Sequence, residues 1–254
     1  MHSPRFPIPV IGLDEPLPLA AQALGSETPW DGLVAAGSDM SAKRLIEAYT
    51  KGIFPWHSQD QMVLWWSMNP RMVLQPSHFK FHRSLKKALK KALLKNQLEI
   101  RVDHDFEAVV DMCAQQKRPG QDGTWIQPEM LSAYAQLHLM GYAHSVETWI
   151  EGQLAGGLYC VSIGQAVFGE SMFSRETNAS KFALTALVSF CHYNGIGAID
   201  CQQQTHHLAS LGAAPVARDL FLKDLATAIE KPAPKWELLP VYWSHFLTTS
   251  QHLT

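Results

Sequence analysis

The spacing of apolar residues predicts two amphipathic helices in the first hundred residues of the chain. Residues 41–52, "SAKRLIEAYTKG", begin with Ser41, a common helix N-cap, and end at Gly52. Between residues 80 and 101, apolar residues starting at Leu85 recur at i, i+3, i+4, i+7 and i+8, the period of a helix with one apolar face. The interval between these helices, "MVLWWSMNPRMVLQP", reads as strands and turns. We therefore expect a small N-terminal α/β domain over residues 1–75.

The remainder of the chain, residues 76–254, predicts a second domain with a sheet. In chain order we expect a strand over 98–102, helices over 106–116 and 128–140, and antiparallel strands over 143–150, 154–164 and 165–174. A long apolar helix then begins with Asn178 as its N-cap and continues to Gly195, and a strand follows over 198–202. Three antiparallel strands, a buried helix and a further strand are the order found in acyl-CoA N-acyltransferases. The expected class is α+β, with an N-acyltransferase-like (GNAT-like) second domain whose sheet is mixed and mostly antiparallel.

The distribution of charge singles out the basic helix. The formal net charge is only −2, yet residues 80–101 hold eight Lys or Arg and one acid, and the other residues hold 13 basic and 22 acidic side chains. An acidic body with one basic strip is typical of a protein that binds a polyanion, although a solvated helix face gives the same pattern. On the opposite side from the apolar stripe lie Lys86, Lys87, Lys90 and Lys91.

Composition and cysteine usage narrow the class of protein. The chain is 46% hydrophobic and 17% charged, enough for a packed core, and no stretch approaches the ~18 apolar residues of a membrane span. The first 30 residues are proline-rich and lack the basic start and apolar core of a signal peptide. The four cysteines form no C-x-x-C pair and are interpreted as reduced thiols. We expect a cytoplasmic, monomeric protein.

Candidate chemistry gathers in "AIDCQQQTHHLASLGA", residues 198–213. His206 and His207 are adjacent and cannot face one ligand from a helix or strand, so we expect no metal. The segment "GESMF" lacks the second glycine of a G-x-S-x-G nucleophile elbow. Strand alternation would place Ile199 and Cys201 on a buried face, where the thiol is inert, and Asp200 and Gln202 together on the other face.

An acyl-CoA-dependent acetyltransferase fits the expected fold, but its phosphate-binding turn does not. Such enzymes need a glycine-rich turn before the central helix, because backbone N–H groups must approach the pyrophosphate. The corresponding turn here, "SRETNAS", contains no glycine. We therefore expect a different acyl donor and no cofactor.

Several longer stretches resemble one family closely. "GLVAAGSDMSAKRLIEAYTKGIFPW", "LWWSMNPR", "GTWI", "AHSVETW", "LAGGLYCVSIGQAVFGESMFSRETNASK" and "IDCQ" with "HLASLGA" occur in order between Gly32 and Gly212. Their combination resembles the leucyl/phenylalanyl-tRNA–protein transferase family. The resemblance implies transfer of Leu or Phe, and less well Met, from aminoacyl-tRNA to the N-terminal Arg or Lys of proteins, which marks them for N-degron degradation.

The resemblance also implies roles for individual residues. Three residues would be catalytic: an Asp200–Gln202 relay would accept the proton of the attacking amine, and Glu170 would lie near the aminoacyl group. The terminal adenosine would stack against Trp56 and Trp125. The aminoacyl side chain would enter a pocket lined by Leu158, Val167, Leu184, Leu187 and Ile199, and the four helix lysines would contact tRNA phosphates. Tyr49 and Tyr134 match family tyrosines near the site, without an expectation that they contact substrate.

Two other functions stay open on the sequence alone. An acyl-CoA-dependent N-acetyltransferase would share the fold, and a non-catalytic module would bind tRNA without turnover. In either case the expected partners include neither a membrane nor a metal.

Overall fold

The computed structural model describes residues 8–56, 62–95, 97–116, 128–239 and 242. Its helices are α1 (Ala42–Thr50), α2 (Arg83–Leu94), α3 (Phe106–Gln115), α4 (Pro128–Leu139), α5 (Ala179–Tyr193), α6 (His206–Ser210) and α7 (Arg218–Ile229). Its strands are β1 (Val10–Ile11), β2 (Leu33–Gly37), β3 (Phe54–Pro55), β4 (Val63–Trp66), β5 (Arg71–Leu74), β6 (Leu98–Val102), β7 (Ala143–Ile150), β8 (Gln153–Ile163), β9 (Ala166–Ser174), β10 (Ile199–Asp200) and β11 (Ala214–Val216).

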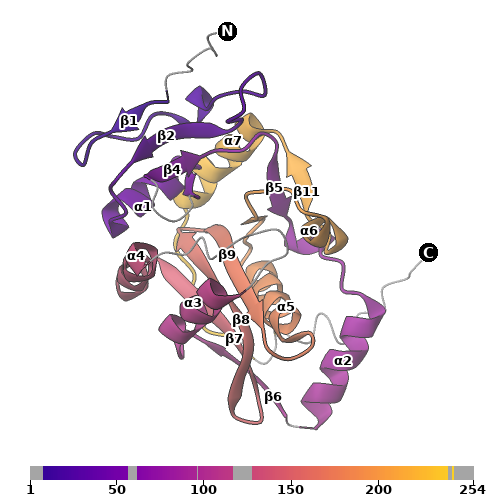
Figure 1. The fold of residues 1–254 in the computed structure, drawn as a ribbon. Coiled ribbons are helices and arrows are strands. Elements are labelled where there is room, and N and C mark those ends of the chain that lie inside the picture. Colours follow the sequence, from indigo (N-terminus) through magenta and orange to yellow (C-terminus); the bar gives the residue numbers. More distant parts are fainter. Residues whose placement is uncertain (1–7, 57–61, 96, 117–127, 240–241, 243–254) are drawn as a thin grey trace.

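The strands of the described residues form two sheets. The smaller has the order β1-β2-β4-β3, and the larger the order β11-β5-β10-β9-β8-β7-β6 (Figure 1). Neighbours in the larger sheet are antiparallel except β9 and β10, which are parallel and are joined through α5. The expectation of a mixed, mostly antiparallel sheet with the acyltransferase order is confirmed.

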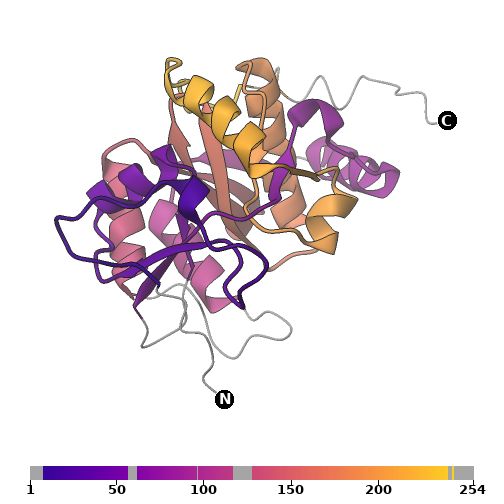
Figure 2. The ribbon, with the colours of Figure 1, turned by 90° about the horizontal axis from the view of Figure 1, so that it is seen from above.

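The two faces of the larger sheet carry different helices. One core cluster contains Tyr49 of α1, Val109 of α3, Tyr134 of α4 and Phe221 of α7, and a second cluster contains Leu187 of α5. Figure 2 shows α5 and α2 on the side of the molecule away from α1. The first cluster also includes residues of the small sheet, so both sheets share one core.

The boundary between the expected domains, at residue 75, stays a prediction. The strand just before it, β5, pairs with β10 and β11 in the larger sheet, not with the small sheet. The chain therefore enters the larger sheet by Arg71, before the expected boundary.

Two local expectations were wrong in detail. Asn178 precedes α5 as expected, but it has a left-handed backbone (φ 70°) and its side chain makes no capping hydrogen bond. The strand expected over 198–202 contains only Ile199 and Asp200, because the chain turns at Gln202, whose φ is +53°. Ser41 caps α1 as expected, accepting a hydrogen bond from the backbone N–H of Arg44 over 3.2 Å.

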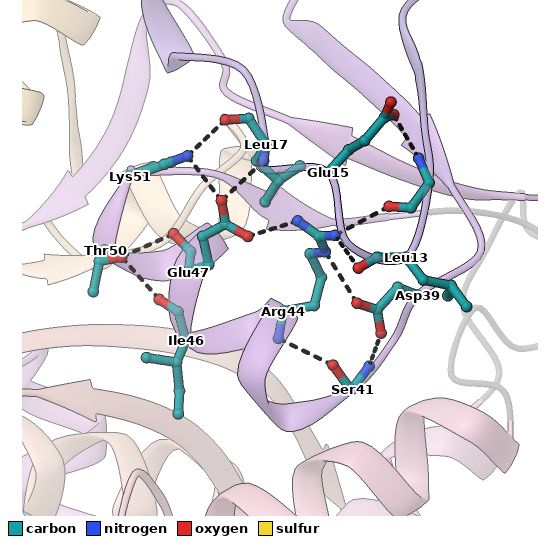
Figure 3. Close-up of polar contacts among 11 residues, drawn as sticks. Leu13, Glu15, Leu17, Asp39, Ser41, Arg44, Ile46, Glu47, Thr50 and Lys51 are labelled. Carbon is teal, nitrogen blue, oxygen red and sulfur yellow. Dashed lines mark hydrogen bonds and ion pairs between the residues drawn. The ribbon is translucent and has the colours of Figure 1, made fainter.

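A network of charges ties α1 to the N-terminal segment (Figure 3). Arg44 is 4% exposed and forms ion pairs with Asp39 (3.2 Å) and Glu47 (2.6 Å). Its Nη2 also donates to the backbone carbonyls of Gly12 and Leu13. These contacts satisfy a buried guanidinium within the small domain, and their role is structural.

Candidate active site

Glu170 owes its orientation to a β-bulge in β9. Cys160 of β8 pairs with Gly169 and Tyr159 pairs with Ser171, so Glu170 is an additional residue with no partner of its own in the ladder. A bulge bends its strand and redirects the side chain at that point. The pairing of β9 with β10 ends at Phe168 and Asp200, just before the bulge. The two parallel strands thus stop pairing where Glu170 and Gln202 meet.

Asp200 is held from two sides. It is 3% exposed, and its Oδ1 and Oδ2 accept hydrogen bonds from Arg71 Nε (2.9 Å) and Nη2 (2.7 Å). Oδ1 also accepts the backbone N–H of Gln202 over 2.9 Å. The expected proximity of Asp200 and Gln202 is present, but it arises from this turn and not from strand alternation.

Gln202 connects Asp200 to Glu170. Its backbone is fixed by Met72 of β5, whose N–H donates to the Gln202 carbonyl over 3.1 Å. Its side-chain Nε2 donates to Glu170 Oε1 over 3.1 Å. The three residues expected to be catalytic therefore form one hydrogen-bonded group, and their roles in catalysis stay proposals.

Two buried tyrosines complete the group. Tyr134 donates to Glu170 Oε2 over 3.0 Å, and the hydroxyls of Tyr134 and Tyr49 lie 2.6 Å apart. Both tyrosines are fully buried, and burial followed by the charge of Glu170 raises the pKa of each well above its usual value. They remain neutral donors at physiological pH.

Glu170 is the titratable group of this site that changes charge near neutrality. Burial, the largest cause, and the charge of Asp200 together raise its pKa from 4.5 to about 7, against the opposing effects of the Tyr49 and Tyr134 hydroxyls and of Arg71. Its side chain stays partly exposed. A carboxylate with this pKa can accept a proton from an amine and return it at neutral pH.

The five residues expected to line an aminoacyl pocket lie together. They belong to one buried apolar cluster on β8, β9, β10 and α5, with exposed fractions of 5% or less: Leu158, Val167, Leu184, Leu187 and Ile199. The cluster begins next to the Glu170 bulge, since Val167 lies three residues before it on β9. Contact with an aminoacyl side chain stays a prediction.

The expected tRNA contacts are more scattered. Trp56 is half-buried and its ring packs 5.8 Å from that of Trp66, while Trp125 lies outside the described residues. Lys87, Lys90 and Lys91 are exposed on α2 and Lys86 is half-buried there. Helix α2 packs on β6, the edge of the larger sheet opposite β11, so the lysines and Glu170 lie on different parts of the fold.

The cysteines of the chain, and the two histidines of residues 198–213, lie outside this hydrogen-bonded group. All four cysteines are free thiols, and burial raises the pKa of Cys201 to about 12. His206 and His207 are exposed at the start of α6. Over the described part of the chain, no group of three His, Cys, Asp or Glu side chains has a geometry that could hold a metal ion.

Arg71 is the residue of this group that sequence reasoning missed. It stands in "NPRMVL", next to an apolar run that forms a buried strand. A charge in such a run signals a buried partner, because an arginine is almost never fully buried unpaired. The partner, 129 positions away in sequence, could not be identified without the fold.

Comparison with known proteins identifies two matching protein-family models. Residues 73–226 match the leucyl/phenylalanyl-tRNA protein transferase model, and residues 38–68 match the N-terminal domain model of the same family. A leucyl/phenylalanyl-tRNA–protein transferase of Polaromonas sp. is 53% identical over 245 residues, 96% of each chain. One of Albidiferax ferrireducens is 50% identical over 248 residues, 98% of each chain.

Solved structures with a similar arrangement are distant. A GCN5-related N-acetyltransferase from Kribbella flavida has a TM-score of 0.36 at 12% identity, over 68% of this chain and 60% of its own. L-PGS from Bacillus licheniformis has a TM-score of 0.36 at 9% identity, over 87% and 66%. At these scores the likeness carries no argument, and the fold assignment rests on the strand order.

Proposed function

The chain belongs to the leucyl/phenylalanyl-tRNA–protein transferase family, and from this membership we propose that it transfers Leu or Phe, and less well Met, from aminoacyl-tRNA to the N-terminal Arg or Lys of acceptor proteins. The observation that carries the proposal is the 53% identity over 96% of both chains. The hydrogen-bonded group of Glu170, Gln202 and Asp200 supports it, since it supplies the proton acceptor that such a transfer needs. The product would be marked for N-degron degradation.

The reaction is the aminolysis of an ester. The acceptor's α-amine attacks the aminoacyl carbonyl carbon, a C–N bond forms, and the C–O bond to the 3′-terminal ribose breaks. An ester becomes an amide, so the step is downhill and uses no ATP. The α-amine has an ordinary pKa of about 7.7–8.0 and is partly unprotonated at neutral pH, so positioning supplies much of the rate gain.

Glu170 is the group that handles the proton in this proposal. The unprotonated carboxylate accepts the proton that the attacking nitrogen loses and gives it to the leaving ribose oxygen as the C–O bond breaks, so that Glu170 is unprotonated again at the end of the step. Gln202 holds Glu170 through Oε1 and Tyr134 holds it through Oε2. Asp200 fixes the turn that carries Gln202 and is too closely bound by Arg71 to be the first acceptor.

We assign the substrate contacts to the residues that the family resemblance implies. The terminal adenosine stacks on Trp56 and Trp125, the aminoacyl side chain enters the apolar cluster around Leu187, and Lys86, Lys87, Lys90 and Lys91 bind tRNA phosphates without reading sequence. We place the monomeric protein in the cytoplasm. No helix of the described residues has the length and apolar character to cross a membrane.

Labelled leucyl-tRNA mixed with the protein and a peptide beginning with Arg, without ATP, tests the proposal. Label in the peptide supports it. Binding of leucyl-tRNA without transfer would favour the non-catalytic module, and thermal stabilisation by a CoA thioester without transfer would favour the acetyltransferase.

A further inference from the structure

The guanidinium of Arg71 is enclosed by parts of the chain that are distant in sequence. Its side chain is completely buried, and its Cζ lies 4.7 Å from the ring centres of both Phe54 and Phe221. Phe54 belongs to β3 of the small sheet, and Phe221 lies in the first turn of α7 (Arg218–Ile229). The two rings restrict the plane of the guanidinium, and favour its charge through cation–π contact.

Two nitrogens of this guanidinium donate hydrogen bonds to the Asp200 carboxylate. Nε and Nη2 contact separate carboxylate oxygens, the two-pronged geometry that fixes a carboxylate most firmly. Lysine could supply the charge at this position but could not fix the plane of the carboxylate. A buried pair of this kind costs desolvation and is weak evidence for stability, so stability alone does not account for it.

A role for the pair follows from the other hydrogen bond of Asp200, to the backbone of Gln202. Oδ1 of Asp200 accepts the Gln202 N–H and so fixes a residue with a left-handed backbone, whose side chain reaches Glu170. We propose that Arg71 is a positioning residue for the transfer reaction, which holds Asp200, and through it Gln202 and Glu170, in the geometry that accepts the amine's proton. This inference rests on the proposed function.

Arg71 also balances charge around Glu170. The titratable or charged side chains that affect Glu170 come from four elements: Tyr49 (α1), Tyr134 (α4), Asp200 (β10) and Arg71 (β5). Tyr159 of β8 packs against Tyr134. The charge of Asp200 raises the pKa of Glu170 and that of Arg71 lowers it. Removing Arg71 leaves Asp200 unopposed, and Glu170 then keeps its proton to higher pH.

The test compares Arg71→Met with Arg44→Met. Arg44 is a matched control, since it is 4% exposed and ion-paired, and its side-chain partners, Asp39, Glu47 and two backbone carbonyls, do not belong to the Glu170 group (Figure 3). For Arg71→Met we expect kcat of leucyl transfer to fall about 100-fold with KM for leucyl-tRNA unchanged, and the acid limb of the pH–rate profile to move to higher pH. Arg44→Met should lower the melting temperature and leave the acid limb of the pH–rate profile at the wild-type pH. If the acid limb of Arg71→Met lies at the same pH as that of wild type, the proposal is overturned.

Arg71→Lys keeps the test decisive if Arg71→Met does not fold. It retains the charge but not the two-pronged contact, so we expect kcat about 10-fold lower and the acid limb in place. A wild-type kcat, or a limb that moves, overturns the proposal. A second measurement separates this inference from the proposed function. The pH midpoint of Glu170 ionisation is followed by the ¹³C chemical shift of its carboxyl, without substrates, in wild type and in Arg71→Lys or Arg71→Met. If the protein transfers no leucine, the proposed function is wrong. If the Glu170 midpoint is equal in wild type and Arg71→Met, the proposed role of Arg71 is wrong.

Discussion

The side-chain amide of Gln202 donates a hydrogen bond to Oε1 of Glu170 over 3.1 Å, across the point where β9 and β10 stop pairing. Two irregularities create this contact. Glu170 is the extra residue of a β-bulge, and Gln202 has a left-handed backbone. Such features cost free energy and cluster at functional sites. Two backbone irregularities therefore coincide at the proposed site.

Replacing Gln202 by glycine separates the backbone from the side chain. Glycine adopts φ near +53° without the penalty that a side chain incurs, so the free energy of unfolding should stay level or rise by up to about 1 kcal/mol. Loss of the amide leaves Glu170 without its Oε1 donor, and transfer should slow at least about 10-fold. Denaturant unfolding and the transfer rate measure the two effects. An unchanged rate would remove Gln202 from the mechanism.

Glu170→Gln should alter how stability depends on pH. Because the folded protein holds the Glu170 proton up to about pH 7, against an ordinary pKa of 4.5, the carboxyl contributes fully at low pH and that contribution is lost as pH rises through 7. Wild type and variant should match near pH 4, and the variant should be more stable above pH 7 by about 2 kcal/mol, less than the full shift implies because the side chain is partly solvated.

The control for this comparison is Glu230→Gln, which changes an exposed glutamate just after α7. Its difference from wild type should stay small and flat across the same pH range. A Glu170→Gln difference that is equally flat would contradict the raised pKa.

Trp56→Ala should weaken the interaction with the 3′ end of the tRNA. Loss of one stacking surface costs roughly 1–3 kcal/mol, or about 5- to 150-fold in KM for leucyl-tRNA. The fold should tolerate the change, since Trp66 Nε1 bonds to the backbone carbonyl of Trp56. Trp30→Ala is the control, because Trp30 also packs against Trp66 and is 41% exposed. Equal effects of the two changes would argue against a stacking role for Trp56.

Changing Lys86, Lys87, Lys90 and Lys91 to glutamine should weaken binding to different tRNAs alike. Each lost phosphate contact lowers the magnitude of the slope of log affinity against log salt by about 0.7–0.9, so the loss of four contacts should lower it by up to about 3.6. Four exposed lysines elsewhere, changed together to glutamine, control for overall charge: Lys43, Lys223, Lys231 and Lys235. If the slope is unchanged in the α2 variant, the basic strip is a solvated face.

The sequence predicted the regular part of the fold well. Strands β7, β8 and β9 follow alternation and glycine-bearing turns, and α5 is apolar on most sides because it is packed on the sheet. Both signals are local, and they were confirmed within one or two residues at the element ends. The family match added the candidate residues, of which Asp200, Gln202 and Glu170 are hydrogen-bonded together.

What the sequence did not predict depends on non-local geometry. The bulge at Glu170 is a one-residue shift against β8, which leaves the alternation of β9 nearly intact in sequence. The turn at Gln202 replaced an expected strand, because the Asp200 carboxylate and Met72 hold the backbone there. The pairing of Arg71 with Asp200 joins strands 129 positions apart.

The most direct test of the account is a single-turnover measurement of leucine transfer from leucyl-tRNA to a peptide beginning with Arg, in parallel with the same peptide acetylated at its N-terminus. The account predicts that wild type transfers leucine to the free peptide alone, with a rate that rises through pH 7 as Glu170 loses its proton, and that Glu170→Gln transfers far more slowly at pH 7 and above. Absence of leucine from the free peptide at every pH, or an equal rate in Glu170→Gln at pH 7 and above, would contradict it.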